Sequence, residues 1–301
     1  MVQRYTQFLG LEQTKQLLIA NENPLNPYIR VNTLKIEPEV LKTRLESKDF
    51  KLKTSKWFSY SFEVLKSPYN LGATHEFLLG YYYLQNLASM LPASILNPQK
   101  DECVIDMCAA PGGKSTHLAQ LMLNSGILIL VDFNLRRIPS LAINIRRLGI
   151  TNSIIMNFNS VELSSLKIKA DKILLDAPCT GEGLIRQDPT RKKSRNQKDI
   201  RKMSKIQEKL LEVGLNNLKI GGKLLYSTCS IAPEENELVI DAVLNKMKDY
   251  EIKEIPIQYG VHGLIDVYDK SLMNNLKFAQ RLYPHLHDTI GFFICLIERK
   301  N

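Results

Sequence analysis

The chain has few cysteines, and none of them forms a pair of the kind that builds a structural site. No two of the five are joined by C-x-x-C spacing; they are Cys103, Cys108, Cys179, Cys229 and Cys295. An odd number with these spacings argues against a disulfide framework and against a structural zinc site. The five histidines show no metal spacing tied to other ligands. We therefore predict no metal, and we expect any special cysteine to be reduced and reactive.

Long apolar runs and targeting signals are also missing. No hydrophobic stretch approaches the ~18 residues that a membrane span needs. The opening stretch, MVQRYTQFLGLEQTKQLL, lacks the basic-then-apolar layout of a secretion signal and is typical of an amphipathic helix. The chain has no repeats and no low-complexity segments. These absences predict a cytoplasmic globular protein that has no membrane partner.

Positive charge is abundant and concentrated in one segment. The 301 residues carry a formal charge of +9, and residues 186–209 hold ten Lys/Arg against three Asp/Glu, a net +7. Such a run is usually a solvated face, but this one directly follows DAPCTGEG, so we expect it at the mouth of a site for a polyanion. Arg186 has an alternative role as a salt-bridge partner of Asp188. The candidate phosphate contacts are Arg30, Lys35, Arg186, Arg191, Lys192, Lys193 and Arg195.

The pattern of apolar residues divides the chain into two predicted domains. Residues 1–97 alternate helical and strand-like stretches, with helices over 2–20, 38–50 and 76–98 and strands over 28–36 and 58–66. Residues 98–301 alternate short buried runs with helical stretches, which predicts a doubly wound, mostly parallel sheet. Its strands are expected at 103–107, 127–132, 153–157, 172–176, 222–228 and 291–299.

A glycine-rich turn follows the first strand of the larger domain. DMCAAPGGKST (106–116) places glycines just before a helix, where the backbone can approach a ligand. A Walker A loop needs glycine where Cys108 stands, and G-x-G-x-x-G is absent, so ATP and NAD are disfavoured. Asp132 ends the second strand, where it can accept from ribose hydroxyls or, alternatively, cap a helix. Loop and acid together fit an adenosine-bearing ligand without a pyrophosphate, such as S-adenosylmethionine.

Three long motifs carry a family resemblance. CAAPGGKSTHLAQ, DAPCTGEG and YSTCSIAPEENE together resemble the Sun-type RNA cytosine-5 methyltransferases, the group that contains the RsmB-like and NSUN enzymes. RVNTLKI also resembles part of the small RNA-binding module of this family, and the layout is most similar to compact archaeal members that act on tRNA. The resemblance implies a Rossmann-like class I S-adenosylmethionine-dependent domain over 98–301. It also implies an α+β (RRM-like) RNA-binding module over 1–97, RNA as substrate (tRNA first, rRNA as the alternative), and an accessory protein as an open possibility.

The resemblance also implies roles for individual residues. Asp132 would hold the ribose, Arg137 would lie near the adenosine, and Asn159 stands where the family usually has an Asp beside the adenine. Asp176 would reach both the cofactor side and the target cytosine. Cys229 would be the nucleophile, and Cys179 would help to release the product. Lys114 would orient a catalytic carboxylate or contact substrate, with a solvated lysine as the alternative. The methionine part of the cofactor would be wrapped by Cys108, Ala109, Ala110, Pro111, Gly112, Gly113 and Lys114.

The chemistry explains why two thiols and a carboxylate belong at strand ends. Cytosine C5 becomes nucleophilic only after a thiolate adds to C6, which is covalent catalysis, and charge then develops at N3 near an acid such as Asp176. From the residues alone, Cys179 and Cys229 are equal candidates for the nucleophile, and in DNA cytosine-5 methyltransferases a Pro-Cys in this region has that role. Two inert, buried cysteines are the structural alternative. A catalytically silent RNA-binding assembly factor is the functional alternative.

Overall fold

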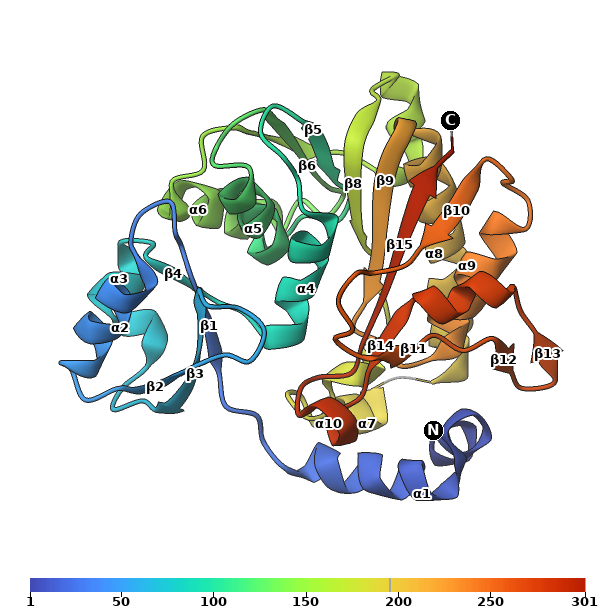
Figure 1. Ribbon diagram of the computed structural model, residues 1–301, viewed down its shortest axis with the longest axis horizontal. Coiled ribbons are helices and arrows are strands. Elements are labelled where there is room, and N and C mark those ends of the chain that lie inside the picture. Colours follow the sequence, from blue (N-terminus) through green and yellow to red (C-terminus); the bar gives the residue numbers. More distant parts are fainter. Residues whose placement is uncertain (195, 301) are drawn as a thin grey trace. The chain divides into compact units, whose positions relative to one another are not determined.

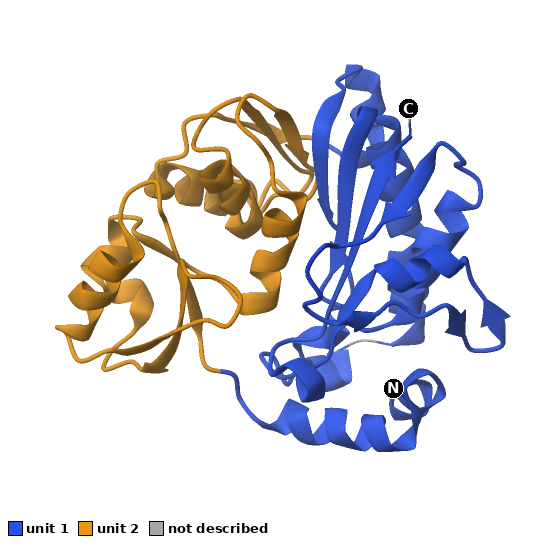
Figure 2. Ribbon diagram, viewed as in Figure 1, with its two compact units in different colours: residues 1–25, 159–301 blue, residues 26–158 orange. Residues whose placement is uncertain are grey.

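The computed structural model describes residues 1–194 and 196–300 and divides the chain into two compact units (Figures 1 and 2). The first, the 26–158 unit, is continuous. The second, the split unit, combines residues 1–25 with residues 159–301, so the first helix belongs with the second half of the chain. The predicted boundary at residue 97 falls inside the 26–158 unit. Arg195, one of the predicted phosphate contacts, lies outside the described residues.

The 26–158 unit begins with a small antiparallel sheet of strand order β2-β3-β1-β4. Helix α2 (Pro38–Glu46) begins at a proline, which has no N–H to lose there, and it buries Leu41 and Leu45 against the sheet residue Phe62. The strands are β1 (Tyr28–Val31), β2 (Lys51–Thr54), β3 (Ser61–Lys66) and β4 (Tyr82–Leu84). The expected α+β character is present, but β2 and β4 were not predicted.

The single helix expected over 76–98 is wrong, because the structure replaces it with three elements. Helix α3 (His75–Leu78) is followed by β4 and then by α4 (Leu87–Leu96). Gly80 has a left-handed backbone (φ 72°), and a Cβ there would lie 1.9 Å from the Arg147 carbonyl oxygen. The tyrosine-rich stretch that follows pairs with β1, as aromatic residues favour. The Asn86 side chain then caps α4. A glycine and a capping asparagine therefore interrupt the helical pattern.

The rest of the 26–158 unit is a parallel α/β arrangement. Strands β5 (Cys103–Asp106), β6 (Ile127–Asp132) and β7 (Ser153–Asn157) pair in that order and all run in the same direction. Helices α5 (Gly113–Leu121) and α6 (Ile138–Leu148) form the crossovers, and both pack on this part of the sheet. The carboxyl ends of the strands lie at one edge, where Asp106 and Asp132 stand. The strands predicted here are confirmed.

The split unit holds the remaining strands. Strands β8 (Ala170–Asp176) and β9 (Leu218–Thr228) are parallel, while β15 (Phe292–Arg299) runs antiparallel to β9. The far edge of β15 pairs with β14 (Gln280–Leu282) and β10 (Tyr250–Lys253), and β11 (Val261–His262) pairs with β14. Strands β12 (Asp266–Val267) and β13 (Lys270–Ser271) form a hairpin. The three strands predicted for this region are confirmed, and β10 to β14 are additional.

The helices of the split unit pack on these strands and on one another. Helix α8 (Gln197–Asn216) packs on β8 and β9, α9 (Glu237–Leu244) packs on α8, and α1 (Val2–Glu22) packs on α10 (Pro284–His287) (Figure 1). Helix α7 (Arg191–Ser194) is one short turn. Within residues 1–194 and 196–300, no helix combines the length and apolar character needed to cross a membrane.

Candidate active site

Two thiols meet at the ends of adjacent parallel strands in the split unit. Cys179 lies three residues after the end of β8, and Cys229 directly follows β9. Their Sγ atoms are 3.0 Å apart in a thiol–thiol hydrogen bond, and both residues are half-buried. Parallel pairing explains the meeting, because it brings the carboxyl ends of β8 and β9 to one edge of the sheet. Cys179 and Cys229, which are 50 residues apart in the sequence, are therefore direct neighbours in the structure.

The surroundings of the pair disfavour ionisation of the Cys179 thiol, whose pKa is raised. The hydrogen bond with Cys229 raises the pKa of the Cys179 thiol well above its usual range, and burial adds to the increase. The carboxylates of Glu235 and Asp176 act in the same direction. Asp176 ends β8, and its Oδ1 accepts a hydrogen bond of 2.8 Å from the Ser227 hydroxyl on β9. Cys179 is thus held as a neutral thiol.

A buried carboxylate holds the two cysteine segments together. Glu235 Oε1 accepts from the Thr180 backbone N–H at 2.8 Å, and Oε2 accepts from the hydroxyls of Thr180 and Ser230 at 2.5 Å each. The Gln207 side chain on α8 donates to the Pro178 carbonyl at 2.8 Å. Burial raises the pKa of Glu235. Sequence reasoning did not single out Glu235, although the paired acids in APEENE were the available signal.

The glycine-rich turn in the 26–158 unit forms a compact loop held by two aspartates. Asp106 ends β5, and its carboxylate accepts from the Cys108 N–H at 3.3 Å and from the Ser115 hydroxyl at 2.7 Å. Asp132 Oδ2 accepts from the Ala110 N–H at 3.1 Å. Gly112 precedes helix α5 with φ 106°, a conformation that favours glycine. Lys114 is the second residue of α5 and is half-buried.

Asp132 is a turn residue and not a helix cap. Its Oδ1 accepts from the Asn134 N–H at 2.9 Å, while the residue that caps α6 is Arg137. Arg137 Nη1 lies 3.4 Å from Asp132 Oδ2, and its guanidinium also donates to the Ala110 carbonyl. Phe133, next to Asp132, has 69% of its surface exposed. The loop, the acid, Arg137 and an exposed ring therefore lie at one strand edge, and sequence reasoning missed the ring.

Asn159 belongs to the split unit and caps a short helical turn. It precedes η2 (Ser160–Leu166), accepts from the Val161 N–H at 3.3 Å and donates to Glu162 at 2.9 Å. The residue itself is exposed.

Arg30 cannot contact a phosphate, because its side chain is fully buried. The guanidinium donates to the Gln85 side chain and the Gly113 carbonyl, each at 2.6 Å, and to the Thr116 hydroxyl at 2.8 Å. It is 0% exposed, and burial lowers its pKa to about 10. No surface is left for a phosphate, so the expectation from sequence is wrong for Arg30. The residue instead ties β1 to the first turn of α5.

The other predicted phosphate contacts have varied surroundings. Lys35 is exposed, and its Nζ donates to two backbone carbonyls at 2.8 and 3.0 Å. Arg186 pairs with Asp288 at 2.7 Å instead of Asp188, and only 8% of its side chain is exposed. Arg191 pairs with Asp188 at 3.1 Å and donates to the Thr180 carbonyl at 2.9 Å. Arg186 and Arg191 thus brace loops, while Lys192 (38% exposed side chain) and Lys193 stay on the surface.

The structure shows no metal centre in the part of the chain that it describes. Residues 1–194 and 196–300 contain no group of three or more His, Cys, Asp or Glu side chains arranged to hold a metal ion.

Sequence comparison finds two family profiles that match in tandem. The profile described as "16S rRNA methyltransferase RsmB/F" matches residues 93–298. The profile described as "N-terminal domain of 16S rRNA methyltransferase RsmF" matches residues 1–87. Together they cover most of the chain.

Individual relatives are similar over most of this chain. The human "28S rRNA (cytosine(4447)-C(5))-methyltransferase" is 37% identical over 294 residues, which are 96% of this chain and 36% of the human protein. The "tRNA (cytosine(72)-C(5))-methyltransferase" of Pyrococcus horikoshii is 37% identical over 254 residues, 83% of this chain and 61% of that protein. The chain thus spans between about a third and three fifths of the length of these curated relatives.

A solved structure shares the fold. NSun6 from Pyrococcus horikoshii, crystallised with SFG, superposes with a TM-score of 0.88 at 28% identity, covering 100% of this chain and 97% of that one. This likeness confirms the predicted fold class, an α/β fold whose central strands are parallel, with a small additional module near the start of the chain.

Proposed function

The chain belongs to the RsmB/F family of 16S rRNA methyltransferases, and from this membership we propose that it transfers a methyl group from S-adenosylmethionine to C5 of a cytosine in RNA. Membership confirms the resemblance to Sun-type enzymes. Relatives of this chain are named for the same reaction on rRNA and on tRNA. The observation that carries the proposal is the thiol pair at 3.0 Å beside Asp176, because cytosine C5 methylation needs a nucleophilic thiolate and an acid near the base.

Cys229 is the proposed nucleophile. Its thiolate attacks cytosine C6, an S–C6 bond forms, and C5 gains the electron density that the methyl transfer requires. Asp176 stands at the end of the neighbouring strand, fixed by the Ser227 hydroxyl, and it is assigned to the N3/N4 edge of the base, where charge develops. The assignment of Cys229 follows the family resemblance, and the contact of its Sγ with a second thiol at 3.0 Å fits a nucleophile that has a helper beside it.

Cys179 is the proposed release residue. Once C5 carries the methyl group, the C5 proton is lost to solvent and the electron pair of the C5–H bond forms the C5=C6 bond as the S–C6 bond breaks. Cys229 departs as a thiolate, and a neutral Cys179 thiol 3.0 Å away can stabilise it by donating a hydrogen bond. A thiol whose pKa is raised is a suitable donor to its neighbour at neutral pH.

The glycine-rich loop and Asp132 fit the proposed cofactor. S-adenosylmethionine, when bound, supplies an electrophilic methyl group on a sulfonium. Residues 108–114 offer a tight backbone turn and the start of a nine-residue helix, while Asp132 offers a carboxylate at a strand end. The exposed Phe133 ring offers a flat apolar surface beside that carboxylate. We assign Arg137 and Asn159 to contacts with the adenosine. We assign Lys114 and Asp176 to the end of the site where the methyl group meets the cytosine.

The remaining assignments concern the RNA. We propose that residues 1–97 form the RNA-binding module, that residues 98–301 form the catalytic domain, and that the protein works in the cytoplasm on tRNA. The 37% identity to an archaeal tRNA enzyme supports tRNA. The surface cations Lys35, Lys192 and Lys193 support contacts with phosphates. rRNA is the second candidate substrate, favoured by the family descriptions and by the human relative.

The test combines labelled cofactor with cysteine variants. The protein, Cys229→Ala, Cys179→Ala and Cys103→Ala are each incubated with methyl-labelled S-adenosylmethionine and tRNA, then resolved on a denaturing gel. We expect 5-methylcytosine with the unaltered protein and with Cys103→Ala, which removes a thiol outside the pair. Cys179→Ala should trap a covalent RNA adduct, and Cys229→Ala should give neither adduct nor product. An adduct from Cys229→Ala alone would reverse the two roles.

The substrate is tested by competition. Equal amounts of tRNA, rRNA fragments and duplex DNA are offered together, and the label is assigned by nuclease digestion. Label in rRNA alone would replace tRNA as the proposed substrate, and label in DNA would favour a DNA enzyme. Tight RNA binding without incorporation into any nucleic acid would favour the assembly-factor alternative.

A further inference from the structure

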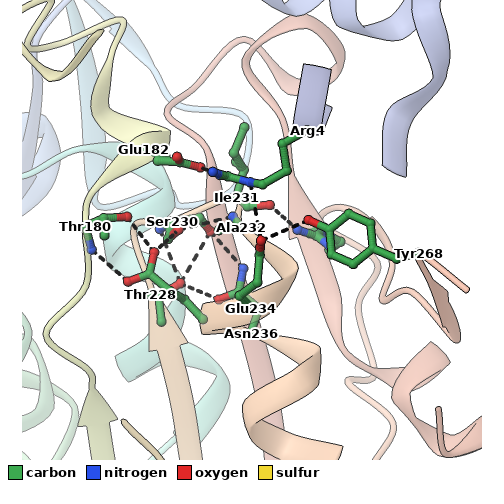
Figure 3. A network of polar contacts seen from close by, with 12 residues as sticks. Arg4, Thr180, Glu182, Thr228, Ser230, Ile231, Ala232, Glu234, Asn236 and Tyr268 are labelled. Atoms are coloured by element: carbon green, nitrogen blue, oxygen red, sulfur yellow. Dashed lines mark hydrogen bonds and ion pairs between the residues drawn. The ribbon is translucent and has the colours of Figure 1, made fainter. Parts of the chain in front are cut away.

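Arg4 on helix α1 bridges the two segments that follow the paired cysteines. Its Nη2 donates to Glu182 Oε2, and its Nε lies 3.5 Å from Glu234 Oε1 (Figure 3). Glu182 is the third residue after Cys179, and Glu234 is the fifth after Cys229. The Arg4 side chain is 8% exposed and the Glu182 side chain 2%. One buried guanidinium therefore contacts a carboxylate from each segment.

Without this cation, the two segments would repel each other. Glu182 experiences the negative charges of Glu234 and Glu235, and burial raises the pKa of its carboxyl despite the ion pair with Arg4. Tyr268 donates to Glu234 Oε1 at 2.9 Å, which stabilises that carboxylate but brings no positive charge. Removing one partner of a buried ion pair leaves the other uncompensated, which is far more costly than losing a surface pair. The charge on Arg4 thus compensates two carboxylates, Glu182 and Glu234, that lie near a third, Glu235.

Helix α1 bends at Gly10 (φ 77°, ψ 167°), and it packs on the rest of the split unit on both sides of the bend. Tyr5 and Leu17 are buried against Ile231, which lies in the segment after Cys229. At the other end of the helix, the Glu22 carboxylate pairs with Lys192 at 2.5 Å. Arg186 donates to the Asn23 carbonyl at 2.7 Å. Both ends of α1 therefore contact the segments that carry or follow the thiols.

We propose that Arg4 is a positioning residue for the reaction: it keeps the segments after Cys179 and Cys229 at the spacing in which their Sγ atoms lie 3.0 Å apart. This inference rests on the proposed function, since it assigns Arg4 to that chemistry. Arg4 itself touches neither thiol in any hydrogen bond of the described residues, and it acts through Glu182 and Glu234. It lies outside the sequence motifs that carry the family resemblance, although it falls within residues 1–87, which match the RsmF N-terminal profile.

The first measurement reports thiol reactivity and needs no RNA. Arg4→Met, Arg4→Lys and the double variant Arg4→Met/Glu182→Gln are alkylated with iodoacetamide, and the modification at Cys229 is followed by peptide mass spectrometry. Lys15→Met, on an exposed position of the same helix, is the matched control. Arg4→Met should slow alkylation of Cys229 about fivefold, the equivalent of one lost hydrogen bond. Arg4→Lys and the double variant should recover much of the rate, and Lys15→Met should match the unaltered protein.

The second measurement is single-turnover methylation together with cofactor affinity. Arg4→Met should lower the methylation rate about tenfold or more, as expected for misplaced reacting groups, with an unchanged dissociation constant for S-adenosylmethionine. An unaltered rate of alkylation in Arg4→Met would overturn the proposal. So would a double variant that is slower than Arg4→Met, because relief of the uncompensated Glu182 charge should help. If no form of the protein methylates RNA, the proposed function fails, while the alkylation rates still decide the role of Arg4.

Discussion

Replacing Arg30 with methionine should weaken folding and cofactor binding together. Burial lowers the pKa of Arg30 from 12.5 to about 10, and at 1.36 kcal/mol per pKa unit this is a penalty of about 3 kcal/mol on the charged form. Three hydrogen bonds from the guanidinium offset the penalty, and at roughly 2 kcal/mol each they contribute about 6 kcal/mol. Methionine removes both effects, so we expect a net loss of about 3 kcal/mol in the free energy of unfolding.

Thermal unfolding and calorimetry measure the two consequences. At roughly 2–4 °C per kcal/mol for a chain of this size, the Tm of Arg30→Met should fall on the order of 10 °C. Since Arg30 donates to the Gly113 carbonyl at the start of α5, the loop should also loosen, and the Kd for S-adenosylmethionine should rise about tenfold, or 1.4 kcal/mol. Lys53→Met is the control, because it also replaces a cationic side chain with methionine, at an exposed position of β2 in the same sheet.

Two results would refute this reasoning. A Tm within about 1 °C of the unaltered protein would mean that the three hydrogen bonds do not outweigh the buried charge. A lower Tm with an unchanged Kd would mean that Arg30 supports the small sheet alone and does not hold the loop.

Four further predictions concern the split unit and its surface. Glu235→Ala leaves the Thr180 N–H without its acceptor and should lower the free energy of unfolding by about 3 kcal/mol in urea titrations, whereas Glu235→Gln, which keeps one oxygen, should lose less than half of that. Burial raises the pKa of Glu235 above 4.5. Its contribution to stability is therefore complete below pH 4.5 and is lost as the pH rises through the pKa of the folded state. In the same urea titrations, the difference in free energy of unfolding between the unaltered protein and Glu235→Gln should shrink between pH 4.5 and 8. Hydrogen peroxide should join Cys179 and Cys229 in a disulfide, since two thiols and one peroxide give one disulfide and two waters. Intact mass spectrometry would record a loss of two hydrogens, and dithiothreitol should reverse it. If peroxide leaves both thiols without a disulfide, the result would contradict the 3.0 Å contact. Lys193→Gln should reduce the slope of log RNA affinity against log salt by about 1, as a filter-binding series would show, and an unchanged slope would remove Lys193 from the RNA contacts.

Local patterns in the sequence account for the strands and for the pairing of the thiols. Short apolar runs mark β5 to β9 and β15, and because β8 and β9 are parallel, Cys179 and Cys229 must lie at one edge of the sheet. What the sequence did not reveal depends on contacts between distant residues. The buried position of Arg30, whose partners include Gln85 and Thr116, follows from tertiary packing that no local pattern encodes.

Two further residues show the same limit. Arg186 has a nearby acid in Asp188, yet it pairs with Asp288, a hundred residues away. The prediction of one helix over 76–98 was wrong for a related reason, because the close approach of Gly80 to Arg147 is a tertiary contact. Electrostatic partners and backbone close approaches thus remain hidden until the fold is known, whereas strand periodicity does not.

The ion pair between Arg4 and Glu182 also bears on the order of events on the ribosome. The two residues are separated by 178 positions, so at 5–20 residues per second Glu182 is synthesised roughly 10–35 s after Arg4. During that interval helix α1 has none of its partners, while residues 26–158 can already complete a compact unit. Strand β15, which pairs with β9, β10 and β14, comes later still. The paired thiols therefore reach their final spacing only near the end of synthesis, and until then the nascent chain lacks the assembled pair that the proposed reaction needs.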